Sequence, residues 1–255
     1  MLHYERIGSG KTCLVLLHGY CENNTCFNEQ VLFFKDLCTT LTIDLPGFGK
    51  SQHCEAASIE DMADQVKAII EKENLVQVIM LGHSMGGYVC LAFANKYKEY
   101  LEGFGIIAST ANADSDERKD KRIQVINFIK QQGKEAYIKN FIPGLFKPGF
   151  DTNIIKERIQ EANKGSEKGM TEAAIAMMNR PDSNFVFKES NLPVFFAIGK
   201  LDELIPAQHL FEQAALCKIA QVVLLEDSAH MPMFETPTQL NIAIESFIQL
   251  VRTNS

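Results

Sequence analysis

The chain has 255 residues, 46% hydrophobic and 22% charged, a composition typical of a globular protein that can enclose both a core and a pocket. Its 25 Lys and Arg residues against 32 Asp and Glu residues give a net charge of −7, which argues against a nucleic-acid partner because phosphate backbones select basic proteins. The first residues lack the basic start and apolar run of a signal peptide, and no stretch nears 18 consecutive apolar residues. We therefore expect a soluble, cytoplasmic protein with no membrane partner.

Short apolar runs alternate with longer amphipathic stretches along most of the chain. Ser58 can cap a helix with one apolar face, and further helices are expected at residues 89–97 and 237–251. The expected strands are residues 13–17, 41–45, 76–81, 103–108, 193–198 and 221–225. Strands that alternate with helices predict an α/β fold, with a mostly parallel, doubly wound sheet covered on both faces.

The alternation stops at about residue 109, where the sequence becomes helical and highly charged. We predict an inserted helical cap at residues 109–185, with residues 1–108 and 186–255 forming the core domain. Residues 109–187 hold 13 Lys and Arg against 11 Asp and Glu, a net charge of +2. Because the whole chain has a net charge of −7, the remaining residues have a net charge of −9. One hypothesis is that this basic cap draws anionic substrates towards the acidic core.

Apolar clusters in the predicted cap must partly face the sheet, which predicts a pocket between the cap and the core. The residues expected to contact a substrate there are Phe141, Leu145, Phe146, Met178 and Met231. We expect Arg180, near the end of the cap, to have a structural role by pairing with a nearby acid.

The strongest chemical motif is Gly82-His83-Ser84-Met85-Gly86, which follows an expected strand and precedes an expected helix. A serine on such a tight turn adopts a strained backbone conformation, and its neighbours two residues away must be small for the turn to close. The motif therefore predicts that Ser84 is a nucleophile.

A serine hydroxyl needs a positioned base, and the base needs an acceptor that orients it. His230 follows the expected strand at 221–225, and Asp202 follows the one at 193–198. Because the carboxyl ends of parallel strands share one edge of a sheet, we expect both side chains to meet Ser84. Asp227 is the second choice for the acid, whereas Asp44 is expected to shape the turn that follows it.

The oxyanion of an acyl-transfer intermediate is best stabilised by fixed backbone N–H groups. One candidate is Met85, directly after the nucleophile at a helix start, and the other is Tyr20, in the loop that follows the strand at 13–17. His18 is expected to hold that loop. Cys21, next to Tyr20, either lies near the pocket as a reactive thiol or is buried and inert.

Seven cysteines with no CxxC pair indicate reduced, mostly structural thiols. A set formed by Cys21, Cys26, His53 and Cys54 matches no usual zinc spacing, so no metal and no cofactor is expected.

The chain resembles the α/β-hydrolase superfamily over nearly its whole length. The motifs that carry this resemblance are, in order, His18-Gly19-Tyr20, the segment 44–51, the segment 82–87, Asp202 and His230. The similar branch is the capped one, with bacterial esterases, enol-lactonases and cofactor-free haloperoxidases. Related dehalogenases and epoxide hydrolases carry Asp at the position of Ser84, so the serine implies an acyl-enzyme.

The resemblance implies a serine hydrolase that cleaves a small-to-medium carboxylic ester, thioester or lactone. In this scheme Ser84 attacks, His230 is base and then acid, Asp202 orients His230, and the N–H groups of Tyr20 and Met85 hold the oxyanion. Two alternatives stay open: a carbon–carbon bond hydrolase with the same residues, and a ligand receptor or signalling protein that uses the pocket without turnover.

Overall fold

The fold is built on one twisted sheet. The computed structural model describes residues 1–254, and within them the sheet has seven strands in the order β1-β3-β2-β4-β5-β6-β7. β1 pairs antiparallel with β3, and all other neighbouring pairs are parallel. The strands are β1 (Tyr4–Ile7), β2 (Cys13–Leu17), β3 (Thr39–Ile43), β4 (Val78–His83), β5 (Leu101–Ile107), β6 (Val194–Gly199) and β7 (Ala220–Leu225).

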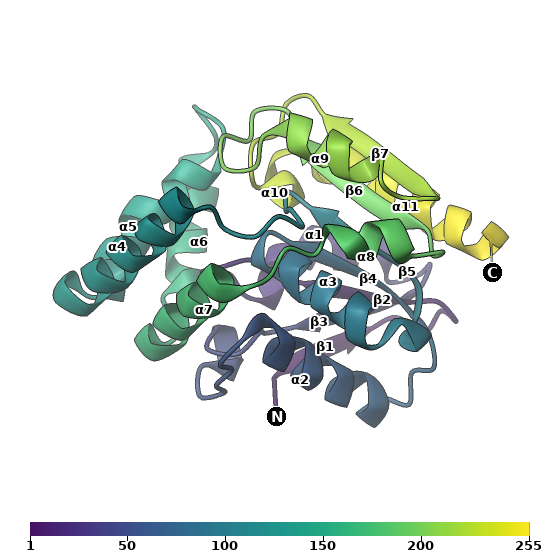
Figure 1. Cartoon of the computed structure of the whole chain (residues 1–255), viewed down its shortest axis with the longest axis horizontal. Helices are drawn as coiled ribbons and strands as arrows, with labels where there is room; N and C mark the ends of the chain where they lie inside the picture. Colours follow the sequence, from purple (N-terminus) through teal and green to yellow (C-terminus); the bar gives the residue numbers. More distant parts are fainter. Residues whose placement is uncertain (255) are drawn as a thin grey trace.

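Helices cover both faces of the sheet, as the alternation predicts (Figure 1). One face carries α2 (Ile59–Lys72), α3 (Met85–Lys96), α8 (Asn184–Glu189) and α9 (Ala207–Ala214), and the other carries α1 (Asn28–Phe34), α10 (Pro232–Glu235) and α11 (Pro237–Asn254). Short 3-10 turns are η1 (Asn24–Phe27), η2 (Gly49–Ser51) and η3 (Lys98–Tyr100). Ser58 is the N-cap of α2, as predicted, because its hydroxyl accepts a hydrogen bond from the Asp61 N–H at 3.0 Å. The predicted α/β fold class is confirmed.

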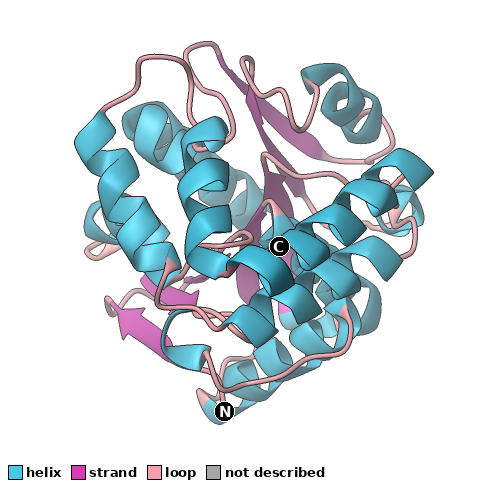
Figure 2. Ribbon diagram, turned by 90° about the vertical axis from the view of Figure 1, so that its left-hand side faces the viewer, coloured by secondary structure: helices cyan, strands magenta, loops and turns pink. Residues whose placement is uncertain are grey.

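Apart from α8, the helices between β5 and β6 form a separate group, which we call the helical insert (residues 116–179). It consists of α4 (Asp116–Gln132), α5 (Lys134–Phe141), the 3-10 turn η4 (Ile142–Leu145), α6 (Thr152–Ala162) and α7 (Glu167–Asn179). The insert stands to one side of the sheet in Figure 1, and in Figure 2 its helices lie in front of the strands. It occupies the place of the predicted cap, whereas the division of the chain into a core and a cap domain stays a prediction.

Every residue of β4 and β6, which lead to Ser84 and Asp202, is buried, as is every residue of β2 and β3. In β7, which leads to His230, only Leu225 is buried. β1 was not predicted, because its residues YERI form no apolar run and are mostly exposed. None of the helices of residues 1–254 combines the length and the hydrophobicity that crossing a membrane requires.

Candidate active site

Ser84 lies on a strained turn between β4 and α3. Its φ of 49° and ψ of −114° are in a region that non-glycine residues rarely adopt, at a cost of about 1–3 kcal/mol. The turn needs glycine on both sides: a Cβ on Gly82 would lie 2.1 Å from the Gly86 oxygen, and a Cβ on Gly86 would lie 2.2 Å from the Leu17 oxygen. The structure therefore shows the serine elbow that the sequence motif predicts.

Three side chains predicted from distant parts of the sequence meet at this elbow. His230 Nε2 lies 2.9 Å from Ser84 Oγ, and His230 Nδ1 lies 2.7 Å from Asp202 Oδ2. The other Asp202 oxygen accepts the N–H groups of Leu204 and Ile205 at 2.8 and 3.0 Å. Burial alone would raise the pKa of Asp202, but His230 and these N–H donors lower it below its usual value, so the carboxylate stays ionised beside the imidazole.

The two other acids considered from the sequence lie outside this chain of hydrogen bonds. The Asp227 side chain is exposed, and its backbone carbonyl accepts a hydrogen bond from Lys147. The Asp44 carboxylate accepts the backbone N–H groups of Asn24 and Lys50, both at 2.8 Å. Asp44 thus shapes the turn, as expected.

The peptide between Gly19 and Tyr20 is held through its carbonyl. His18 Nδ1 donates to the Gly19 oxygen at 2.8 Å, while His18 Nε2 accepts the Leu45 N–H at 2.8 Å, which fixes the tautomer. In a trans peptide the C=O and N–H point in opposite directions, so this hydrogen bond also sets the direction of the Tyr20 N–H. The loop passes beside the serine, since a Cβ on Gly19 would lie 3.1 Å from Ser84 Cβ.

The peptide between Ser84 and Met85 is held in the same way. The Ser84 carbonyl accepts hydrogen bonds from the Ser109 hydroxyl at 2.7 Å and from the Gly87 N–H at 2.9 Å. Met85 is the first residue of α3, so its N–H has no carbonyl one turn earlier in the helix to bind. Ser109, which follows β5, carries no sequence signal for this position and was missed by the sequence analysis.

A buried ion pair lies behind the Gly19 loop and was also missed. Glu22 accepts the Gly19 N–H at 2.9 Å and lies 3.1 Å from His83 Nδ1, while His83 Nε2 donates to the His230 carbonyl at 2.8 Å. Both ring nitrogens of His83 therefore donate, as only an imidazolium can. Burial alone would lower the pKa of His83, but Glu22 raises it above its usual value.

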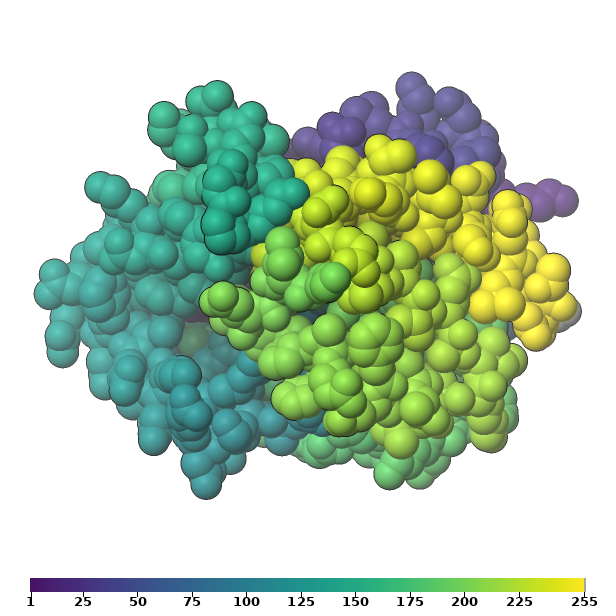
Figure 3. All heavy atoms as spheres, turned by 90° about the horizontal axis from the view of Figure 1, so that it is seen from above, coloured from purple at the N-terminus to yellow at the C-terminus, as the bar shows by residue number. Residues whose placement is uncertain are grey.

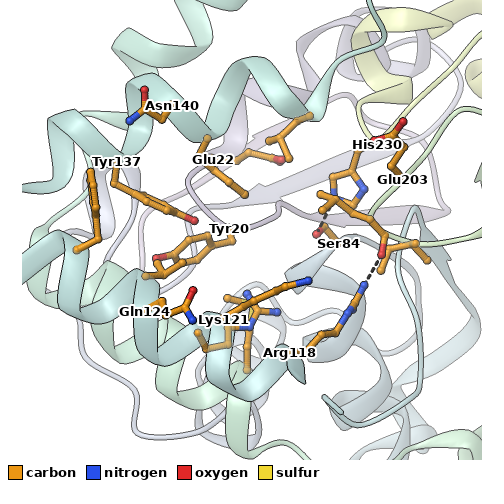
Figure 4. Close-up of a pocket in the computed structure, with 18 of the residues that line it drawn as sticks. Tyr20, Glu22, Ser84, Arg118, Lys121, Gln124, Tyr137, Asn140, Glu203 and His230 are labelled. Carbon is orange, nitrogen blue, oxygen red and sulfur yellow. Dashed lines mark hydrogen bonds between the residues drawn. The ribbon is translucent and has the colours of Figure 1, made fainter. Parts of the chain in front are cut away.

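A cavity of about 650 Å³ opens from Ser84 towards the insert. Figure 4 shows Ser84 and His230 at one end, Tyr137 and Asn140 of α5 at the other, and residues of α4 along the side. Figure 3 shows the surface hollowed where the teal insert meets the green segment after β6. Of the predicted contact residues, Phe141 and Leu145 line the cavity.

Phe146, Met178 and Met231 do not line this cavity, which corrects the expectation for them. Phe146 stacks on Phe150, with ring centroids 4.9 Å apart, and Met231 is fully buried. Met178 borders a separate surface hollow, because successive helix residues are rotated by about 100° and it is Met177 that faces the cavity. The rotation of a helix about its axis was not evident from the sequence.

Of the two alternatives for Cys21, a reactive thiol near the pocket or a buried thiol, the structure shows the buried one. It is 1% exposed, it is absent from the cavity wall, and burial raises the pKa of its thiol well above the usual value. Within residues 1–254, no three histidine, cysteine or acidic side chains stand close enough to hold a metal ion.

Comparisons with known proteins show the family of this chain. A family model described as the alpha/beta hydrolase fold matches residues 12–237. A pimeloyl-[acyl-carrier protein] methyl ester esterase of Vibrio vulnificus is 24% identical, over 96% of this chain and 97% of its own length. The chain thus belongs to the α/β-hydrolase fold family.

Solved structures show the same fold. A thermophilic esterase from Thermogutta terrifontis, solved with malate bound, has a TM-score of 0.93 and 29% identity, covering 98% of this chain and 93% of that chain. The enol-lactonase from Burkholderia xenovorans LB400 has a TM-score of 0.88 and 19% identity, covering 97% and 96%. The family resemblance stated from the sequence is confirmed.

Proposed function

We propose that this protein hydrolyses a small-to-medium carboxylic ester, thioester or lactone through an acyl-enzyme on Ser84. The observation that carries the proposal is the chain of hydrogen bonds from Ser84 Oγ through His230 to Asp202, on an elbow strained to present the hydroxyl. The names of the similar proteins, among them esterases and an enol-lactonase, support ester or lactone chemistry.

The proposed reaction has two halves. His230 Nε2 takes the Ser84 proton as the oxygen attacks the substrate carbonyl, and Asp202 stabilises the imidazolium that forms. The tetrahedral oxyanion is held by the N–H groups of Tyr20 and Met85. The intermediate collapses, His230 gives its proton to the leaving oxygen or sulfur, and a water activated by His230 then releases the acid from Ser84.

The insert acts as a cap in this proposal. A cavity of about 650 Å³ lies within the range of small-molecule sites, so the acyl and alcohol parts together have the size of a small-to-medium ester. The seven free cysteines fit a reducing compartment, and we place the protein in the cytoplasm.

The test combines a fluorophosphonate probe with p-nitrophenyl esters of graded chain length. We expect covalent labelling at Ser84 and turnover that peaks at one chain length, both lost in Ser84→Ala and both retained in the control Ser9→Ala, which changes an exposed serine. Labelling without ester turnover would favour the carbon–carbon hydrolase or the receptor. Absence of labelling would overturn the assignment of the nucleophile.

A further inference from the structure

One wall of the cavity carries positive charge from a single helix. Arg118, Lys121, Arg122 and Val125 all line the cavity from α4, at the spacing of one helix face. Arg118 donates to the Leu204 carbonyl, and Lys121 pairs with the exposed Glu117. Figure 4 shows the Arg118 and Lys121 side chains extending from α4 towards the side where Ser84 lies.

Arg122 belongs to a buried cluster that is not neutral. The Asp114 carboxylate, which has no exposed side-chain surface, lies 3.0 Å from Arg122 Nε and 2.8 Å from Arg180 Nη1. Arg180 thus pairs with an acid, as the sequence analysis expects. Two guanidinium groups share one carboxylate, so the cluster has a net charge of +1.

The two arginines differ in how much of their hydrogen-bonding capacity the protein uses. Arg180 also donates to the carbonyls of Met177 and Asn112, and it lies over the Tyr88 ring at 3.8 Å from the centroid. Arg122 uses only Nε: among the hydrogen bonds of residues 1–254, none involves its two Nη groups, and neither group is sealed from solvent. Since Arg122 lines the cavity, these donors are available to a bound molecule.

Two hydroxyl groups that line the same cavity also lack a partner in the part of the protein that the structure describes. Tyr88 and Tyr137 line the cavity, and within residues 1–254 neither hydroxyl has a protein hydrogen-bond partner or is sealed from solvent. Burial alone would lower the pKa of Arg122, but the Asp114 carboxylate that it contacts helps to raise it above its usual value, so the guanidinium stays charged. The cavity lining therefore offers the Arg122 guanidinium and two hydroxyl groups as hydrogen-bond donors.

The acids that line the cavity leave this charge in place. Glu22 is engaged by His83 and the Gly19 N–H. Glu203 is exposed, and among the ion pairs of residues 1–254 it forms none with Arg122. The net charge of +1 on the cluster of Arg122, Arg180 and Asp114 matches a monoanion, and the planar fork of the Arg122 guanidinium fits a carboxylate.

We propose that Arg122 binds a carboxylate of the substrate, so that this site selects esters or lactones of acids that carry a second, ionised carboxyl group. The inference rests on the proposed function, because it names the substrate class of the same site. The earlier hypothesis attributed the attraction of anionic substrates to the charge of the whole insert, whereas this proposal attributes it to the contact with Arg122.

The experiment compares monomethyl adipate, which is anionic, with dimethyl adipate, which is neutral. We expect Arg122→Gln to lower the ratio of kcat/KM for the anionic ester to that for the neutral ester by about 10- to 100-fold, the loss typical of a hydrogen bond to a charged group. The matched control is Lys119→Gln, which removes the same charge from the same helix at an exposed position outside the cavity and should leave the ratio unchanged. Asp114 keeps Arg180 as its partner in Arg122→Gln, so the variant is expected to fold, and its Tm checks this.

A binding measurement separates this proposal from the proposed function. By calorimetry, the Ser84→Ala protein should bind monomethyl adipate, and adding Arg122→Gln should weaken that binding at least about tenfold. If no ester is hydrolysed but this binding pattern holds, the proposed function fails and the carboxylate site stands. An unchanged ratio in Arg122→Gln, an equal drop in Lys119→Gln, or no binding by Ser84→Ala protein would overturn the carboxylate site.

Discussion

The buried pair of Glu22 and His83 makes a quantitative prediction about stability. Burial alone would raise the pKa of Glu22, but His83 and the Gly19 N–H lower it from 4.5 to about 2. A drop of about 2.5 in pKa corresponds to about 3 kcal/mol of folding free energy at neutral pH. The raised pKa of His83 reports the same interaction, so it is counted once. We expect Glu22→Gln to lower the free energy of unfolding by up to about 3 kcal/mol.

The pH dependence of this loss follows from the directions of the two pKa changes. Glu22 has a lowered pKa, so its contribution is complete above about pH 4.5 and is lost as the pH falls towards 2. His83 has a raised pKa, so its contribution is complete below about pH 6.5 and is lost as the pH rises through its folded-state pKa. The difference between the parent protein and Glu22→Gln should therefore be largest between about pH 4.5 and 6.5.

The assay is urea unfolding followed by circular dichroism, because the sequence has no tryptophan. The control is Glu5→Gln, which removes an exposed carboxylate 3.6 Å from Lys50 and should cost about 0–1 kcal/mol. A loss in Glu22→Gln no larger than in Glu5→Gln at pH 6 would refute the reasoning, as would a difference that stays constant down to pH 2.5.

Two further predictions concern the proposed chemistry. Asp202→Asn should lower kcat by about 10⁴-fold in ester turnover, because an amide at this position favours the wrong tautomer of His230, whereas an effect below about tenfold would contradict the orienting role. Ser109→Ala should lower kcat about tenfold with little change in KM. The reason is that the Ser84 carbonyl loses one hydrogen bond, so the Met85 N–H is less firmly directed. A change confined to KM would argue against this role.

The elements that local rules determine could be predicted from the sequence. Buried strands such as β2 and β4 are continuous apolar runs, and the elbow at Ser84 requires glycines at fixed spacing. The positions of Asp202 and His230 followed from a general property of parallel sheets, in which strand ends meet at one edge. Periodicity, the motif at Ser84 and the topology of the sheet were sufficient to predict the parallel strands and the meeting of Ser84, His230 and Asp202.

The features that depend on packing between distant elements could not be predicted. The polar β1 is a strand because it pairs with β3, which places Tyr4 beside Ile43. Its sequence has no apolar pattern that predicts a strand. Glu22 is a charged loop residue whose partner is 61 positions away. Arg122 lies in a stretch of charged residues that resembles a solvated helix face, and only the packing of α4 on α5 and α7 turns it towards a cavity.

The loop that carries His230 is tied to the insert as well as to the sheet. The His230 N–H donates to the Leu145 carbonyl at 3.1 Å, the Lys147 N–H donates to Glu235 at 2.6 Å, and Lys147 Nζ donates to the Asp227 carbonyl at 2.8 Å. The His230 carbonyl is held by His83 on the other side. Because Leu145 also lines the cavity, the segment that shapes the pocket also positions the base. Sequence changes that reshape this part of the insert must therefore keep these contacts if His230 is to stay in place.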